Sequence, residues 1–96
     1  MSELAAIAIT IARPGCEEPL AKALEALIEP TRREAGHLQY DMHRDLRDPR
    51  CFVFIERWES EETFQAHVDS PHVADYLRMA APWVERSEVR ALAKVR

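Results

Sequence analysis

Hydrophobic and polar positions along the chain recur with two different periods, and the changes of period divide it into predicted strands and helices. Residues 4–12 are apolar and rich in β-branched side chains, which predicts a strand that ends at a Pro-Gly turn. Across residues 17–34 the apolar positions recur at helical spacing, with acids and a proline at the start, where helices favour them. Pro30 is expected to kink this helix or end its regular part, and Gly36 to close it.

Three further segments have the pattern of strands. Residues 37–44 and 51–58 show strand character, and the connector between them is short enough for a hairpin. Residues 87–95 alternate between apolar and polar side chains, which predicts a last strand. The resulting order, β-α-β-β-α-β, predicts an α+β, ferredoxin-like sandwich that forms one domain over residues 1–96. Its antiparallel sheet would be covered by two helices on one face.

A helix in two parts is predicted between the hairpin and the last strand. Ser60 is a good N-cap and acidic residues follow it in the first turn. Ser70 then resembles a second N-cap, with Pro71 at the first helical position. We therefore expect the helix to break, restart, and run to about residue 84.

Both faces of the first strand are apolar, but they differ in size. Three isoleucines share one face and three small residues share the other: Ile7, Ile9 and Ile11 against Ala6, Ala8 and Thr10. Because two helices cover only one face of a sheet, we expect the other face to pack on the sheet of a second copy, giving a homodimer. The small-residue face either leaves room for a cavity beneath the helices or is filled by large helix residues.

Composition and charge narrow the function classes. The net charge of −4 argues against nucleic-acid binding, which needs concentrated positive charge. The apolar stretch near the N-terminus is too short to cross a bilayer and lacks the basic lead-in of a signal peptide. We therefore expect a cytoplasmic protein without membrane contacts. In that compartment Cys16 and Cys51 are expected to be free thiols.

Candidate chemistry is concentrated in the two-part helix and the strands before it. Phe64 and His67 lie on one helical stripe, so His67 is expected to point inward. After the restart, His72 and Tyr76 are one turn apart on one face. Trp58 ends the third strand, two residues before the helix begins. In the second strand, Tyr40 and His43 lie on opposite faces, so at most one of them can face a given cavity.

The two histidines have three interpretations. A zinc or iron site usually has three or more protein ligands, whereas His67 and His72 are five residues apart across a helix break. No acidic or thiol partner has suggestive spacing, so we expect no metal. General acid–base catalysis is the second interpretation, because imidazole titrates near neutrality. In the third, His67 is a hydrogen-bonded core residue and His72 donates near the restarted helix.

The segment from Gly36 to His72 closely resembles the antibiotic biosynthesis monooxygenase family, particularly its small bacterial members described as quinol monooxygenases. The recurring family pattern is G-x-x-x-Y, then a strand ending in E-x-W-x-S, then A-H-x-x-S/T-P-H. Here these elements are Gly36 to Tyr40, residues 56–60, and residues 66–72. The element order and the first turn extend the resemblance over essentially the whole chain.

The resemblance implies an architecture and a reaction. Family members are ferredoxin-like monomers whose sheets pack together as a dimeric α/β barrel, in agreement with the homodimer expected from the strands. The oxygenase members use no flavin, haem or metal, which implies that no cofactor is needed. The implied substrates are O₂ and a small aromatic molecule, a quinol or polyphenol, that supplies an electron to oxygen once it is deprotonated.

The resemblance also implies site residues. Catalytic roles are expected for His67, His72 and Trp58, with Trp58 and His67 in the pocket and His72 near its mouth. Which histidine is the base stays open. The expected substrate-binding residues are aromatic: Tyr40, Tyr76, Phe64 and Phe54, with Tyr76 near the mouth.

Other reactions on the same fold are the alternatives. Haem-degrading relatives depend on an asparagine, a tryptophan and an axial histidine, whose positions correspond here to Ala8, His67 and Leu77, so haem degradation is not expected. A relative that isomerises a phosphorylated sugar also carries H-x-x-T-P-H. Isomerisation of a small phosphorylated or dicarbonyl metabolite therefore stays open, as does a non-catalytic dimeric ligand-binding or stress protein. Trp58 favours the quinol oxygenases.

Overall fold

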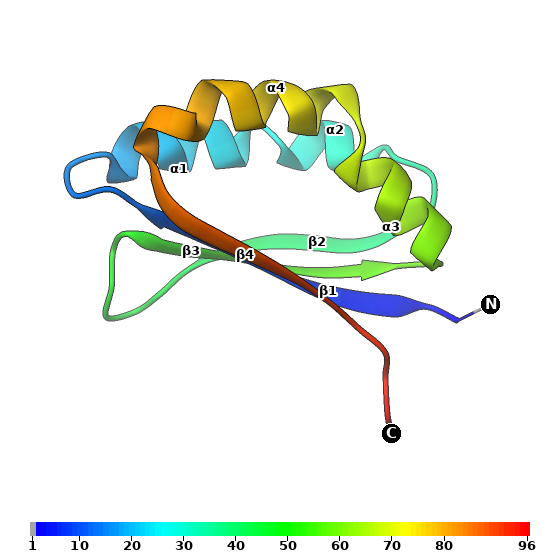
Figure 1. The fold of residues 1–96 in the computed structure, drawn as a ribbon. Coiled ribbons are helices and arrows are strands. Elements are labelled where there is room, and N and C mark those ends of the chain that lie inside the picture. The colour runs from blue at the N-terminus through cyan, green and yellow to red at the C-terminus, as the bar shows by residue number, and fades with distance from the viewer. Residues whose placement is uncertain (1) are drawn as a thin grey trace.

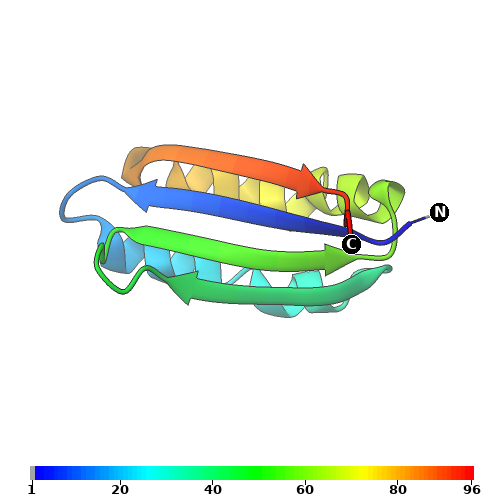
Figure 2. The same cartoon turned by 90° about the horizontal axis from the view of Figure 1, so that it is seen from below.

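The fold is a four-stranded antiparallel sheet with helices packed on one face (Figure 1). The computed structural model describes residues 2–96. In chain order the elements are β1 Leu4–Ala12, α1 Glu17–Glu25, α2 Ile28–Arg32, β2 His37–Arg44, β3 Cys51–Trp58, α3 Glu61–Val68, α4 Pro71–Ala80, the 3₁₀ turn η1 Ala81–Trp83, and β4 Val84–Leu92. The strand order is β2-β3-β1-β4, as the view from below shows (Figure 2). This is the ferredoxin-like α+β fold that the sequence predicted.

The two faces of β1 differ in environment as well as in size. Ala6 is fully buried beneath the helices, whereas Ile7 on the opposite face is only half-buried. Ile7 pairs across the ladder with Ile55, which is 41% exposed. Figure 2 shows that no helix covers this face. In a single chain the sheet therefore presents apolar side chains on its open face.

The first helical region breaks earlier than predicted. α1 ends at Glu25 and α2 begins at Ile28, and the tight turn between them is closed by the Leu27 N–H, which donates to the Leu24 carbonyl at 3.1 Å. Pro30 is the third residue of α2 and so lies in a first turn, where the missing N–H costs nothing. The helix therefore breaks before Pro30 and not at the proline itself.

Gly36 joins α2 to β2 at a point where α3 approaches closely. Its φ of +84° is a left-handed conformation, and a Cβ placed there would lie 2.4 Å from Cβ of Thr63. The carbonyl of Gly36 accepts a hydrogen bond from the Glu59 N–H at 2.9 Å. A residue without a side chain is required here because the connection to β2 packs directly on α3.

The predicted helix break is confirmed, with one difference in its capping. Ser60 caps α3 as predicted, accepting a hydrogen bond from the Thr63 N–H at 3.2 Å. Pro71 is the first residue of α4, also as predicted. The Ser70 hydroxyl, however, does not cap α4; it donates to the His67 carbonyl at 2.6 Å. Ser70 therefore ties the end of α3 to the start of α4.

The last strand lies three residues upstream of its predicted position. The α-helix ends at Ala80 and the 3₁₀ turn η1 continues to Trp83, close to the predicted end at about residue 84, but β4 spans Val84–Leu92 instead of residues 87–95. β1 dictates this register, because its ladder with β4 runs from Ala12 opposite Val84 to Ala5 opposite Leu92. The alternating pattern continues past the point where β1 offers a partner, and Val95 is fully exposed.

Both cysteines of the chain, Cys16 and Cys51, are free thiols, as predicted. Within residues 2–96, no helix is long and apolar enough to cross a membrane.

Candidate active site

A cavity of about 430 Å³ lies between the helices and the sheet. The small residues Ala8 and Thr10 of β1 form part of its sheet side, where larger side chains would fill the space. The structure thus answers the question left open by the sequence, in favour of a cavity. The lining residues come from both layers: Ala8, Thr10, Leu24, Leu27, Tyr40, Phe54, Glu56, Phe64, His67, Val68, Val73, Tyr76, Leu77, Ala80, Ala81, Val84, Ser87 and Val89.

Exposed apolar side chains mark the opening of the cavity. Leu77 of α4 is 59% exposed and Val89 of β4 is 58% exposed, and Val68 at the end of α3 is 40% exposed. Other lining residues such as Tyr40 and Phe54 are almost completely buried. The cavity therefore has an apolar rim and an enclosed, aromatic interior, which favours a planar apolar ligand over a charged one.

His67 is the imidazole of this cavity. It is 6% exposed, and its position on the inner stripe of α3 follows from the helical spacing with Phe64. Its ring stacks on Trp58 with centroids 4.8 Å apart and meets Tyr40 edge-on at 5.3 Å. Two aromatic rings therefore hold the imidazole plane in one orientation.

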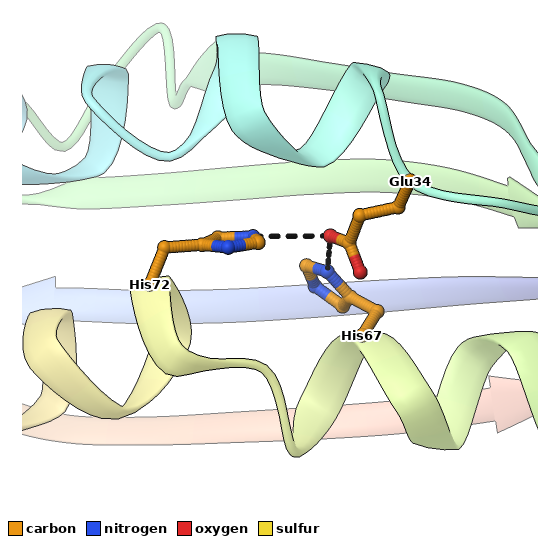
Figure 3. A group of neighbouring side chains, drawn as sticks. All are labelled: Glu34, His67 and His72. Atoms are coloured by element: carbon orange, nitrogen blue, oxygen red, sulfur yellow. Dashed lines mark hydrogen bonds and ion pairs between the residues drawn. The ribbon is translucent and has the colours of Figure 1, made fainter.

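A carboxylate fixes the imidazole further. Oε1 of Glu34 lies 2.8 Å from Nδ1 of His67 and 3.0 Å from Nε2 of His72 (Figure 3). Glu34 follows α2, His67 lies on α3 and His72 lies in the first turn of α4. Since an ionised carboxylate only accepts hydrogen bonds, both imidazoles donate to the same oxygen. This places the proton of a neutral His67 ring on Nδ1 and leaves Nε2 as an acceptor.

His72 belongs to a hydrogen-bond network beside the cavity and does not line it. Its Nε2 lies 3.2 Å from Oγ1 of Thr31 and 3.4 Å from Oγ of Ser70, besides its contact with Glu34. Thr31 is fully buried, and its side chain lowers the pKa of the Tyr40 phenol in part. The network thus joins Glu34, Thr31 and Ser70 to the half-buried His72.

Burial changes the acid–base behaviour of both cavity tyrosines. Burial, reinforced by the negative charge of Glu56, raises the pKa of Tyr40 well above its usual value, and the hydrogen bond with Thr31 opposes this rise only in part. Burial likewise raises the pKa of Tyr76, which a hydrogen bond with Thr10 partly offsets. Both phenols therefore stay protonated at neutral pH, where they can donate hydrogen bonds to a ligand.

Glu56 is a second buried carboxyl group of the cavity. It is 3% exposed, and its Oε1 accepts a hydrogen bond from Nε1 of Trp58 at 3.0 Å. Burial raises the pKa of Glu56, while the Trp58 donor and the neighbouring His67 lower it. A buried carboxyl group is costly, so its presence in a cavity marks it as a candidate functional group.

The structure brings most of the predicted site residues together. Five of them line the cavity: His67, Tyr40, Tyr76, Phe54 and Phe64. Two do not, and these placements correct the expectation. Trp58 is fully buried behind His67 instead of lying in the pocket, and His72 lies in the Glu34 network instead of at the mouth. Their effect on a ligand would therefore pass through His67.

Two residues of the site were missed from the sequence. Glu56 had a signal, because the pattern of β3 places this acid on the same face as Phe52 and Phe54, which pack in the core. Glu34 had none, since it lies 33 residues from His67 in an unremarkable polar stretch and meets it only through the packing of α2 on α3.

Comparisons with known proteins agree with this architecture. The family described as "Antibiotic biosynthesis monooxygenase" matches residues 4–79. Putative monooxygenase Rv0793 of Mycobacterium tuberculosis is 36% identical over 75 residues, covering 78% of this chain and 73% of that protein. Putative monooxygenase YcnE of Bacillus subtilis is 25% identical over 65 residues, covering 68% of each chain.

Solved structures match over the whole fold. PA3566 from Pseudomonas aeruginosa superposes with a TM-score of 0.93 at 32% identity, covering 100% of this chain and 97% of that one. The structure of Rv0793 superposes with a TM-score of 0.91 at 31% identity, covering 99% of this chain and 97% of that one.

Proposed function

Because this chain belongs to the antibiotic biosynthesis monooxygenase family, we propose that it oxygenates a small quinol or polyphenol with O₂, without a cofactor. The observation that carries the proposal is the position of His67 in the wall of an aromatic cavity, with Nδ1 held by Glu34 at 2.8 Å. This arrangement presents a proton acceptor to a ligand in a largely dry site.

The shape and chemistry of the cavity support an aromatic substrate. A volume of about 430 Å³ is in the range of small-molecule sites and accommodates a molecule of one to three rings. Tyr40 and Phe54 stack on each other with centroids 4.5 Å apart and offer a flat apolar wall. The phenols of Tyr40 and Tyr76 supply donors for a substrate oxygen, so the site combines apolar contact with a few directional polar groups.

His67 is the proposed general base. Its Nε2 makes no hydrogen bond to any of residues 2–96, whereas Nδ1 donates to Glu34. When Nε2 accepts the phenolic proton, the resulting imidazolium is stabilised by the adjacent carboxylate. In this scheme Glu34 is a positioning residue that fixes the tautomer, and Trp58 positions the ring by stacking on it.

The chemistry that follows belongs to the substrate and oxygen. The phenolate transfers one electron to O₂, and the resulting superoxide and phenoxyl radical combine at a ring carbon that carries hydrogen. The peroxide anion formed in this way takes the proton back from the His67 imidazolium and becomes a hydroperoxide. Loss of water from that hydroperoxide leaves a quinone, so a phenol and O₂ become a quinone and water and His67 returns to its neutral form. The protein contributes deprotonation, orientation of the ring, and exclusion of bulk water.

We also infer that two copies associate through the open face of the sheet. That face carries a central apolar stripe from β1 and β3, including Ile7, Ile9 and Val53, which stay half-buried in one chain. Charged side chains such as Asp41 of β2 and Glu88 of β4 flank the stripe. An apolar centre with a polar rim is the usual composition of a stable protein interface.

Oxygen consumption with a panel of hydroquinones, naphthols and polycyclic phenols tests the proposed reaction. We expect uptake above the autoxidation blank for at least one compound, and loss of that uptake in His67→Gln. Gln65→Ala is the matched control, because Gln65 is an exposed residue of the same helix. Conversion that proceeds equally well without O₂ would contradict the proposal and favour isomerisation.

A further inference from the structure

Three ligand-type side chains converge beside the cavity from separate elements. The ligand atoms of Glu34, His67 and His72 all lie within 4.8 Å of one another (Figure 3). Their side chains are only 17%, 7% and 25% exposed, respectively, so the cluster is not a chance meeting of solvated groups. The break between α3 and α4 makes this convergence possible, because it lets two consecutive helical segments direct their imidazoles at one point.

The charge around Glu34 is incompletely balanced. Within residues 2–96, the ion-pair partners of Glu34 are the two imidazoles, and no lysine or arginine pairs with it. A carboxylate in this half-buried position favours a cation, because burial removes much of the water that would otherwise solvate its charge. The two ring nitrogens beside it are donor atoms for a metal ion when they are not protonated.

We propose that Glu34, His67 and His72 form a binding site for one divalent transition-metal ion, with Zn²⁺ as the best match. Two imidazole nitrogens and one carboxylate oxygen are preferred by zinc, cobalt, nickel and ferrous iron, whereas magnesium and calcium prefer oxygen ligands throughout. The fourth position is open to water or an anion, as in zinc sites with three protein ligands.

The distances suit such an ion after a small adjustment. Neighbouring ligands of a zinc ion with bonds of about 2.0–2.1 Å lie roughly 3.0–3.4 Å apart. Oε1 of Glu34 is 2.8 Å and 3.0 Å from the two imidazole nitrogens, close to that spacing, and the two nitrogens themselves lie within 4.8 Å of each other and must come closer where they exceed it. The ion replaces the two N–H protons that now donate to this oxygen. His72, the most exposed of the three side chains, can make the remaining movement at the start of α4.

If the proposed function holds, occupation of this site inhibits it, and this consequence rests on that proposal. A metal ion bound to Nδ1 of His67 forces the neutral ring to carry its proton on Nε2. Nε2 then cannot accept the proton of a phenol. The same ion also occupies Glu34, which would otherwise stabilise the imidazolium. The site therefore acts as a switch in which the metal and proton transfer exclude each other.

Metal binding is tested directly on the untagged full chain after chelator treatment. Titration with Co²⁺, followed by its visible absorption, and with Zn²⁺, followed by calorimetry, is expected to give one equivalent per chain. Glu34→Gln and His72→Gln should each weaken binding at least tenfold, with folding checked by circular dichroism. His43→Gln is the matched control, since His43 is an exposed histidine remote from the cluster. Mg²⁺ should not compete.

Two results would overturn the site: no stoichiometric binding by the parent, or equal binding by the parent and both cluster variants. Oxygen uptake in the presence of one equivalent of Zn²⁺ is the separate arm for inhibition, where unchanged or increased uptake would overturn the switch. Because the titrations need no substrate, they stand even if no quinol is oxidised. A failure of the proposed reaction is thereby distinguished from a failure of the metal site.

Discussion

Nδ1 of His67 lies 2.8 Å from Oε1 of Glu34, although 33 residues separate the two in the chain. The contact fixes which nitrogen of the imidazole carries its proton and which nitrogen is left for a ligand in the cavity. The proposed chemistry and the proposed metal site both depend on this pair, and so do the first two predictions.

Replacing His67 by glutamine should remove the base while leaving much of the cavity in place. General-base catalysis contributes roughly 10²–10⁴-fold, so kcat should fall by that order. Binding of a non-oxidisable phenol, measured by fluorescence quenching, should change little because the aromatic wall remains. A kcat within twofold of the parent would show that another group accepts the proton.

Replacing Glu34 by glutamine tests the tautomer. An amide at this position can donate to Nδ1 of His67, which drives the ring proton onto Nε2 and blocks it as an acceptor. We expect kcat to fall roughly 10²–10⁴-fold with KM nearly unchanged, because the carboxylate itself does not line the cavity. Glu29→Gln is a suitable control, since Glu29 is an exposed acid of α2. Equal loss in both variants, or a rise in KM alone, would contradict a positioning role.

Glu56→Gln should stabilise the protein at neutral pH. Burial raises the pKa of Glu56 in the folded state above its usual value of 4.5, so the fold holds this proton more tightly than the unfolded chain does. The stabilising contribution is therefore complete below about pH 4.5, falls as the pH rises through the elevated pKa, and stays lost at neutral pH. Glutamine keeps an acceptor for Nε1 of Trp58 without the charge.

Thermal unfolding of the parent and of Glu56→Gln between pH 4 and pH 8 measures this effect. The variant should have the higher Tm at pH 7, and the difference should shrink on acidification. A variant that is less stable at every pH would mean that the charge of Glu56 stabilises the fold through interactions stronger than its burial cost.

Two glycines with the same backbone conformation offer an internally controlled comparison. Gly15 and Gly36 have φ of +85° and +84°, but only Gly36 faces a neighbour, with Thr63 at 2.4 Å from an added Cβ. Gly15→Ala should cost about 1–2 kcal/mol of unfolding free energy, the price of a left-handed alanine. Gly36→Ala should cost at least about 1 kcal/mol more, because Thr63 must move. Denaturant unfolding measures both, and equal costs would show that α3 yields freely.

The proposed dimer is tested at the centre of the open sheet face. Ile9 lies in the middle strand β1 and pairs with Val53, so Ile9→Arg should place a charge within the interface and give a monomer in analytical ultracentrifugation. Leu46→Arg is the control, because Leu46 is 96% exposed in the β2–β3 connection. An unchanged mass for Ile9→Arg would remove the sheet face from consideration.

The sequence predicted those parts of the fold in which local pattern and tertiary packing agree. The apolar, β-branched run of β1, the cap at Ser60 and the proline at position 71 predicted element positions that the structure confirms. The predicted position of β4 was three residues too far along the chain, because the alternating pattern continues beyond Leu92. Only the pairing with β1 decides where this strand begins and ends. The break before Pro30 depends on a turn that no proline or glycine marks.

The site was predictable only in part, for the same reason. His67 and the aromatic residues lie on faces that the periodicity of one helix or strand identifies. Glu34 does not, since its role arises from the packing of the α2 end against α3 and α4, a relation between segments that no local spacing encodes. The position of Trp58 behind His67 likewise depends on how the two rings stack, because this packing decides which ring faces the cavity.

Incorporation of ¹⁸O from labelled O₂ into the product is the most direct test of the proposed function. The reaction is run under ¹⁸O₂, and the quinone product is reduced at once to limit exchange of its oxygen with water. Mass spectrometry of the reduced product should show one labelled oxygen atom per molecule. The same product should be absent with His67→Gln. A product without label, or turnover that continues without oxygen, would contradict the assignment of this cavity to oxygenation.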